Sequence, residues 1–201
     1  MDVYSVAENL RKRRFLAEVC PTVADARARV LEIAGDRSVG IGGSRSVGEA
    51  GLYDALKAHG NAVLCHTLVP PEEKEAMRRA ANAAEVYLCS ANAVTADGVI
   101  VNIDGTGNRV AGTLYGPHTV IMLVGRNKLA EDIAAGVERT KRDCCPNNAR
   151  RIGVKTPCAA TGKCADCASA ARMCNATVLH EYPTRNVTAF HVLLVDEELG
   201  W

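Results

Sequence analysis

Hydrophobic and polar positions along this 201-residue chain follow two alternating patterns, which together predict a repeated strand–helix order. Apolar residues spaced three or four positions apart predict helices, and short continuous apolar runs predict strands that are buried on both faces. The predicted helices span residues 3–20, 23–34, 46–59, 70–83 and 127–142. The predicted strands span residues 38–41, 62–65, 85–91, 99–103, 119–125, 176–181 and 189–195.

This order predicts a doubly wound α/β fold with a mostly parallel sheet. We expect one domain over residues 1–201, because a chain of this length with 48% hydrophobic residues can bury one core. The Cys-rich loop at 156–175 and the closing strands at 176–195 are expected to form an appendage on its edge.

Composition excludes several classes of partner. The net charge is +1 and aromatic residues make up 4% of the chain, so neither a basic nor a stacking surface for nucleic acid is expected. No apolar run is long enough to insert into a membrane. The first residues carry no apolar signal sequence, so we expect a cytoplasmic protein with reduced cysteines.

The first candidate site is a glycine-rich loop between a predicted strand and a predicted helix. Glycines allow the backbone to approach an anion, and ligands bind beyond the carboxyl ends of strands in open α/β sheets. The expected ligand-binding residues of this loop are Gly42, Gly43, Ser44, Arg45 and Ser46. Ser46 and Glu49 are expected to cap the following helix. The alternative is a plain connecting turn, and the loop matches neither a dinucleotide fingerprint nor a phosphate-binding Walker loop.

Three further segments follow predicted strands and carry polar side chains. Asp104 is the predicted catalytic acid or base, and Asn108 and Arg109 are predicted to orient an acidic substrate. Arg126 and Lys128, after the strand at 119–125, are expected to face the same cleft, with plain surface charge as the alternative. The segment at 90–98 is the doubtful member, because its connection to the next strand is too short for a helical crossover and predicts a hairpin. Each segment has the alternative of an ordinary turn.

Four cysteines near the C-terminus form the most specific pattern, C-x5-C-x2-C-x6-C. They are Cys158, Cys164, Cys167 and Cys174. Thiolates at this spacing suit zinc or an iron–sulfur cluster. Structural thiols and a redox disulfide stay open as alternatives. The adjacent pair Cys144 and Cys145 has no assigned role.

These motifs together resemble the LUD family, the domain of bacterial lactate-utilization proteins. The resemblance is carried by GIGGSRSVGEAGLYDAL, SANAVTADGVIVNIDGTGNRVAGTLYGP, VIMLVGRNKL and NARRIGVKTPCAATGKCADCASAARMCN, in that order. It implies a fold like that of the phosphosugar isomerase and coenzyme A transferase group. It also implies a link to the oxidation of lactate to pyruvate, with redox partner subunits that carry iron–sulfur centres. The ferredoxin-like segment of larger members is missing from this chain.

Two function classes follow from the sequence. The first is an enzyme or enzyme subunit that handles a small anionic metabolite, either lactate- or pyruvate-like or phosphorylated. The second is a non-catalytic binding or assembly module with a metal-stapled cysteine loop. No nicotinamide or flavin motif is present. The sequence leaves open whether the chain is an enzyme and whether it forms a homo-oligomer.

Overall fold

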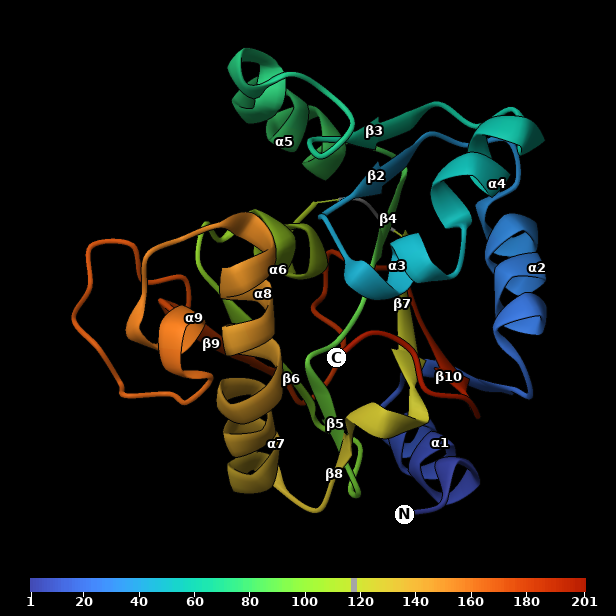
Figure 1. Ribbon diagram of the computed structural model, residues 1–201. Helices are drawn as coiled ribbons and strands as arrows, with labels where there is room; N and C mark the ends of the chain where they lie inside the picture. The colour runs from blue at the N-terminus through green and yellow to red at the C-terminus, as the bar shows by residue number, and fades with distance from the viewer. Residues whose placement is uncertain (117–118) are drawn as a thin grey trace.

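The computed structural model describes residues 1–116 and 119–201 and has two sheets (Figure 1). The central sheet is parallel throughout, in the order β1-β10-β7-β4-β2-β3. Its strands are β1 (Leu16–Cys20), β2 (Val39–Ile41), β3 (Val63–Cys65), β4 (Val86–Cys89), β7 (Thr119–Gly125) and β10 (Ala189–Val195). The smaller sheet has the order β8-β5-β6-β9. Its strands are β5 (Ala93–Thr95), β6 (Ile100–Asp104), β8 (Leu129–Ala130) and β9 (Ala176–His180).

Helices cover both sheets. The α-helices are α1 (Val3–Lys12), α2 (Val23–Ala34), α3 (Arg45–Glu49), α4 (Leu52–His59), α5 (Lys74–Asn82), α6 (Asn108–Leu114), α7 (Ile133–Arg139), α8 (Cys145–Ile152) and α9 (Pro157–Thr161). Short 3-10 turns are η1 (Pro71–Glu73) and η2 (Arg126–Lys128), and η3 (Thr140–Cys144) is a π-helical turn. No described helix is long and apolar enough to cross a membrane.

Side chains of the fully buried strand β7 alternate between two cores. Ile121 and Leu123 point to the core under α2, α3 and α4, whereas Val120 and Met122 point to the core under α1 and the smaller sheet. Figure 1 shows α2 and α4 on one side of the central sheet and α6, α7 and α8 on the other. The molecule is therefore layered, and α7 closes the outer face of the smaller sheet through a third small cluster.

The predicted α/β class and mostly parallel sheet are confirmed, but the placement of the last strands was wrong. β10 lies inside the central sheet between β1 and β7, and β9 pairs with β6. β10 is therefore part of the main core, because Val192, Leu193 and Leu194 are at most 1% exposed. The phosphosugar isomerase and coenzyme A transferase likeness stays a prediction.

Two long predicted helices proved to be composite. The segment at 3–20 divides at Arg14, whose φ of 67° is left-handed, and its second half is strand β1. The segment at 127–142 becomes η2, the short strand β8 and helix α7, which begins after Asp132 caps it. The chain then continues through the π-helical turn into α8, whose first turn holds Pro146. Proline lacks the N–H that a regular ladder needs, which accounts for an irregular turn here.

Replacing a core residue of β10 should reveal its central position. We expect Leu193→Ala to lower the free energy of unfolding by about 2–5 kcal/mol, because it empties a fully buried site. Urea denaturation monitored by circular dichroism measures this. The matched control is Leu179→Ala on β9, where the residue is 41% exposed, and it should cost less than about 1 kcal/mol. Equal losses in both variants would contradict a central β10.

Candidate functional site

Loops after the carboxyl ends of β2, β4 and β7 meet in one pocket. The loop after β2 holds Gly43 and Ser44, the segment after β4 holds Ser90, and η2 after β7 holds Lys128. The full lining is Gly43, Ser44, Arg45, Ser46, Ser90, Ala91, Asn92, Ile103, Arg109, Lys128, Thr140, Cys144, Cys145, Asn148, Arg151, Met173 and Trp201. Its volume of about 110 Å³ suits a metabolite of few atoms, since pockets that hold drug-sized ligands measure about 300–1,000 Å³.

The pocket lining is cationic. Four basic side chains line it, from Arg45, Arg109, Lys128 and Arg151, and no Asp or Glu does so among the residues that the structure describes. Glu49 lies nearby, but its carboxylate accepts from the Gly200 N–H at 2.6 Å and pairs with Arg45 Nε at 2.5 Å. An anion is therefore the ligand that this lining favours.

Lys128 is the most deeply buried of these cations. The residue is 3% exposed, and its Nζ donates to Ser46 Oγ at 2.6 Å and to Ser90 Oγ at 2.8 Å. The pKa of this amine is lowered to about 7, mainly by burial; the guanidinium groups of Arg139 and Arg109 add to the shift, while Cys144 and Glu49 oppose it. Lys128 therefore changes its charge near neutral pH.

Arg109 binds the segments that frame the pocket. Its Nη1 donates to Ser90 O at 2.9 Å and to Asn102 Oδ1 at 2.6 Å. Its Nη2 donates to Asn92 Oδ1 at 2.9 Å and to Ile103 O at 2.8 Å. One guanidinium thus fastens the end of β4 to β6 of the other sheet, which gives Arg109 a structural task as well as a place in the lining.

Asp104 lies behind the pocket and does not line it. Its Oδ1 accepts from the backbone N–H groups of Thr106 and Gly107, at 3.1 and 3.0 Å, and its Oδ2 accepts from that of Val110 at 3.3 Å. Because these amides open α6, the contacts assign Asp104 to shaping the loop and helix start. Asp104 Oδ2 also lies 3.8 Å from Nε of the lining residue Arg109, and a role of Asp104 as acid or base stays a prediction.

The other predicted ligand-binding residues are divided. Gly43, Ser44, Arg45 and Ser46 line the pocket, whereas Gly42, Asn108 and Arg126 do not. Asn108 Nδ2 reaches Gly42 O at 3.5 Å, and Arg126 pairs with Asp196 at 3.6 Å on the surface. Gly43 has a left-handed φ of +80°, so a glycine is needed there.

The local structure of the glycine loop differs from the expected capping. Ser44, not Ser46, is the N-cap of α3, and its Oγ accepts from the Val47 N–H at 3.3 Å. Ser46 is free to bond Lys128 instead. α3 has five residues, so its dipole is small and the positive charge of the pocket comes from side chains.

The segment at 90–98 begins at the pocket and ends in the turn of the β5–β6 hairpin, at a surface ion pair. Strand β5 was not expected, and it forms the antiparallel hairpin with β6, while the strand before it belongs to the central sheet. Ser90 and Asn92 line the pocket, so the doubtful part of the sequence contributes directly. Asp97 lies at the far end, where its carboxylate pairs with Arg13 at 2.6 Å.

The sequence placed Lys128 beside Arg126 at the cleft, and Lys128 lines the pocket, but Arg139 and Arg151 were missed as site residues. Arg139 is 7% exposed and donates to Asn127 O, Asn92 O and Cys144 Sγ. Lys128 was predicted from its position just beyond the carboxyl end of β7, two residues after Arg126. The two arginines lie on α7 and α8, which the predicted helix at 127–142 only partly covered.

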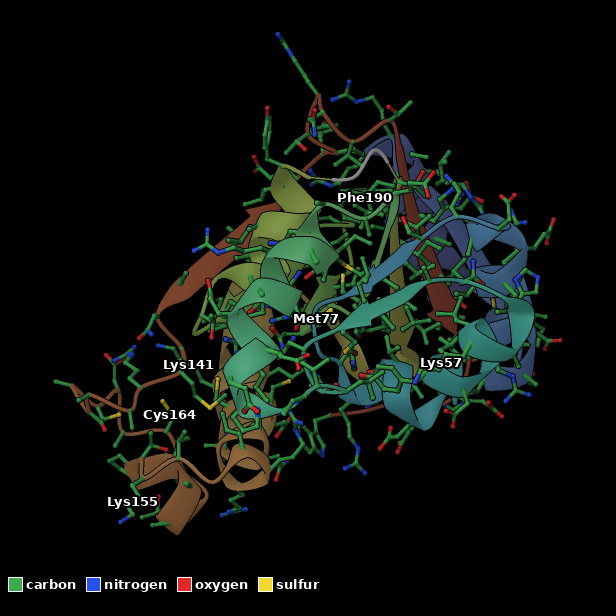
Figure 2. The ribbon with its side chains drawn as sticks, turned by 90° about the horizontal axis from the view of Figure 1, so that it is seen from above. Lys57, Met77, Lys141, Lys155, Cys164 and Phe190 are labelled. Carbon is green, nitrogen blue, oxygen red and sulfur yellow. The ribbon has the colours of Figure 1, made fainter. Side chains whose placement is uncertain are left out.

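The cysteine loop packs beside the pocket, on α8. Arg150 Nε of α8 donates to Ala159 O of α9 at 2.9 Å, and Met173 lines the pocket. Burial raises the pKa of the Cys145 thiol to about 12. Four nearby cysteines act in the same direction, Cys174, Cys144, Cys158 and Cys164. Figure 2 shows Cys164 at the edge of the molecule, near Lys141 of the π-helical turn.

The four cysteines of the motif lie in one loop, but their thiols do not converge on a common point. All are partly or fully exposed free thiols, and over residues 1–116 and 119–201 no three His, Cys, Asp or Glu side chains are placed to hold a metal ion. One local feature does suit a thiolate ligand. The Asp166 N–H donates to Cys164 Sγ at 3.5 Å, and Asp166 has a left-handed φ of 43° inside the C-x-x-C turn. The cysteine pattern in the sequence therefore suits a metal ion, but the positions of the thiols in this structure do not yet converge on one.

Comparison with known proteins identifies the family. The family model described as LUD domain matches residues 3–195. A solved structure, described as a DUF162 family protein from Deinococcus radiodurans, is similar with a TM-score of 0.53 and 13% identity. The alignment covers 96% of this chain and 94% of that one. A search of curated proteins gave no match.

Proposed function

The chain belongs to the LUD domain family, since the match covers almost its whole length. From this premise we propose that it is a lactate-utilization-type protein that handles a small anionic metabolite in the basic pocket. The observation that carries the proposal is a lining with four cationic side chains and, among the described residues, no carboxylate. A carboxylate or phosphate group would offset this charge through charge-assisted hydrogen bonds.

Small 2-hydroxy and 2-oxo acids are the ligands to test first. The resemblance to lactate-utilization proteins favours lactate and pyruvate, and the pocket volume suits molecules of that size. In a lactate-oxidising system, electrons would pass to partner subunits with iron–sulfur centres. A purely structural module is not favoured, because it would have no use for a buried lysine beside two serine hydroxyls in an open pocket.

Arg151→Gln should weaken anion binding without affecting the fold. Arg151 is exposed at the rim, lines the pocket and donates only to Asn148 Oδ1 in its own helix. Loss of one charged contact to the ligand should lower affinity for lactate, pyruvate or phosphorylated acids about tenfold, or about 1.4 kcal/mol. Thermal-shift titration with these acids and their neutral amides measures the effect.

The matched control is Arg142→Gln. Arg142 is also exposed, but it pairs with Asp143 and lies outside the pocket lining. It should leave the affinity unchanged. If none of the acids stabilises the wild-type protein at millimolar concentration, or if both variants lose affinity equally, the proposed pocket is wrong.

We further propose that the cysteine loop takes up zinc or an iron–sulfur cluster when its partly exposed thiols close together. The C-x5-C-x2-C-x6-C spacing and the N–H donated to Cys164 Sγ support this. Protein purified without oxygen should hold about one zinc ion or one cluster per chain. Metal analysis and an ultraviolet–visible spectrum measure the content.

Cys164→Ser with Cys167→Ser should abolish this metal content, whereas Cys20→Ser should retain it. Cys20 is a buried thiol at the end of β1, remote in sequence from the loop. Metal-free wild-type protein from anaerobic preparation would overturn the proposal, as would metal that survives the double substitution.

A further inference from the structure

The buried amine of Lys128 has a chemical setting that anion binding alone does not require. Its Nζ contacts two hydroxyl groups, Ser46 Oγ and Ser90 Oγ, at 2.6 and 2.8 Å. Each hydroxyl has a second partner of its own, because Ser46 Oγ reaches Leu199 O at 3.3 Å and Ser90 Oγ reaches Ala91 O at 3.2 Å. The lysine lines the pocket while the residue stays 3% exposed, so the pocket is the way for a ligand to reach the amine.

Burial favours the neutral amine of Lys128. It is the main cause that lowers the pKa to about 7, and the nearby guanidinium groups of Arg139 and Arg109 act in the same direction. Cys144 and Glu49 act in the opposite direction, and the Glu49 carboxylate is already held by Arg45 and the Gly200 N–H. Desolvated lysines beside other cations are the ones that attack carbonyl carbons at neutral pH.

The geometry points to Lys128 as an imine-forming residue for a small 2-oxo acid. We propose that the carboxylate of the acid lies among the arginines of the pocket and that Lys128 Nζ attacks the ketone carbon. This inference rests on the proposed function, because it places a ligand of that class in the same pocket.

The step balances without any other reactant than a proton. The amine lone pair forms the carbon–nitrogen bond, and the ketone oxygen takes up a proton that a serine hydroxyl relays from the amine. The resulting carbinolamine then loses water as the hydroxyl group leaves with a proton from solvent, which the second serine hydroxyl can relay. One amine, one ketone and one proton thus give one iminium ion and one water, and nothing is oxidised or reduced.

The experiment is reductive trapping of the iminium ion. Wild-type protein is incubated with pyruvate and cyanoborohydride, and intact mass and tryptic peptides are measured. We expect one added reduced pyruvyl group on the peptide 127–139, because trypsin cleaves after Arg126 and Arg139 but not after an alkylated lysine. Lactate has no ketone and should give no adduct, and as a competing anion it should slow the labelling by pyruvate.

Two variants sharpen the assignment. Lys128→Arg should abolish the adduct, and Lys57→Arg should retain it, since Lys57 is an exposed residue of α4 (labelled in Figure 2) that does not line the pocket. Peptide mapping of the wild-type protein locates the adduct even if Lys128→Arg fails to fold.

The outcomes separate this inference from the proposed function. An adduct on Lys128 that lactate suppresses supports it. Calorimetric binding of pyruvate with no adduct would overturn the imine and leave the anion pocket standing. Labels spread over surface lysines without competition by lactate would overturn the imine as well. Absence of both binding and labelling would overturn the two proposals together.

Discussion

Arg109→Met is expected to destabilise the protein by about 3–5 kcal/mol, the largest loss of any single substitution in the site. The guanidinium donates to four acceptors on two segments, Ser90 O and Asn92 Oδ1 after β4 and Asn102 Oδ1 and Ile103 O on β6. Its side chain is 14% exposed, so water can replace few of these bonds. The midpoint of urea unfolding, with an unchanged dependence on urea concentration, measures the loss.

Two controls test the reason for this loss. Arg142→Met should change the free energy of unfolding by less than about 0.5 kcal/mol, because Arg142 is 64% exposed and pairs only with the adjacent Asp143. Arg109→Lys should recover only a small part, since a single ammonium cannot reach four acceptors arranged around a planar fork. Full recovery with lysine, or a loss no larger than for Arg142→Met, would contradict the structural role of Arg109.

Lys128→Met is expected to change how stability depends on pH. Burial lowers the pKa of Lys128 from its ordinary value of 10.5 to about 7 in the folded protein. Between these two values the unfolded chain binds more protons than the folded chain, so the free energy of unfolding rises with pH. The wild-type protein should therefore gain up to about 1.4 kcal/mol for each pH unit in this range, relative to Lys128→Met.

The comparison between the two proteins isolates the lysine, because the titration of the nine cysteines is common to both. Chemical denaturation between about pH 7 and about pH 9 should show the wild-type protein gaining about 2 kcal/mol on the variant. Below about pH 7 the difference should stay constant, since Lys128 is then charged in both states. If the free energies of unfolding of the two proteins change with pH in parallel over the whole range, Lys128 keeps its ordinary pKa and is not neutral near pH 7.

Much of the fold could be predicted because its strands are short apolar runs and its helices carry clear capping residues at their ends. The runs at 119–125 and 189–195 and the helix at 23–34, with its Thr22 cap and Gly35 end, were predicted within a residue or two. Sheet order was not predictable in this way. β10 pairs with β1 and β7, which lie far away in sequence, and only long-range packing places it between them. Local periodicity also failed at Arg14, where a single left-handed residue separates helix from strand.

The sequence predicted where the residues of the candidate site lie better than it predicted what each residue does. The carboxyl ends of parallel strands share one edge of a sheet, and this rule correctly predicted that the glycine loop and Arg109 lie at the pocket. Roles depend on contacts that sequence does not contain. Asp104 was the obvious acid in its motif, yet backbone amides occupy its oxygens. Lys128 was expected at the cleft, with plain surface charge as the alternative, but its burial arises from the packing of three loops.

The most direct test of the account is a calorimetric titration of pyruvate and of its neutral amide at about pH 8, in two buffers of different ionisation enthalpy. Lys128 is mostly neutral there in the free protein, and a bound anion raises its pKa. We predict that the acid binds, that the amide does not, and that up to about one proton is taken up per site. Equal binding of acid and amide, or anion binding without proton uptake, would contradict an anion pocket centred on Lys128.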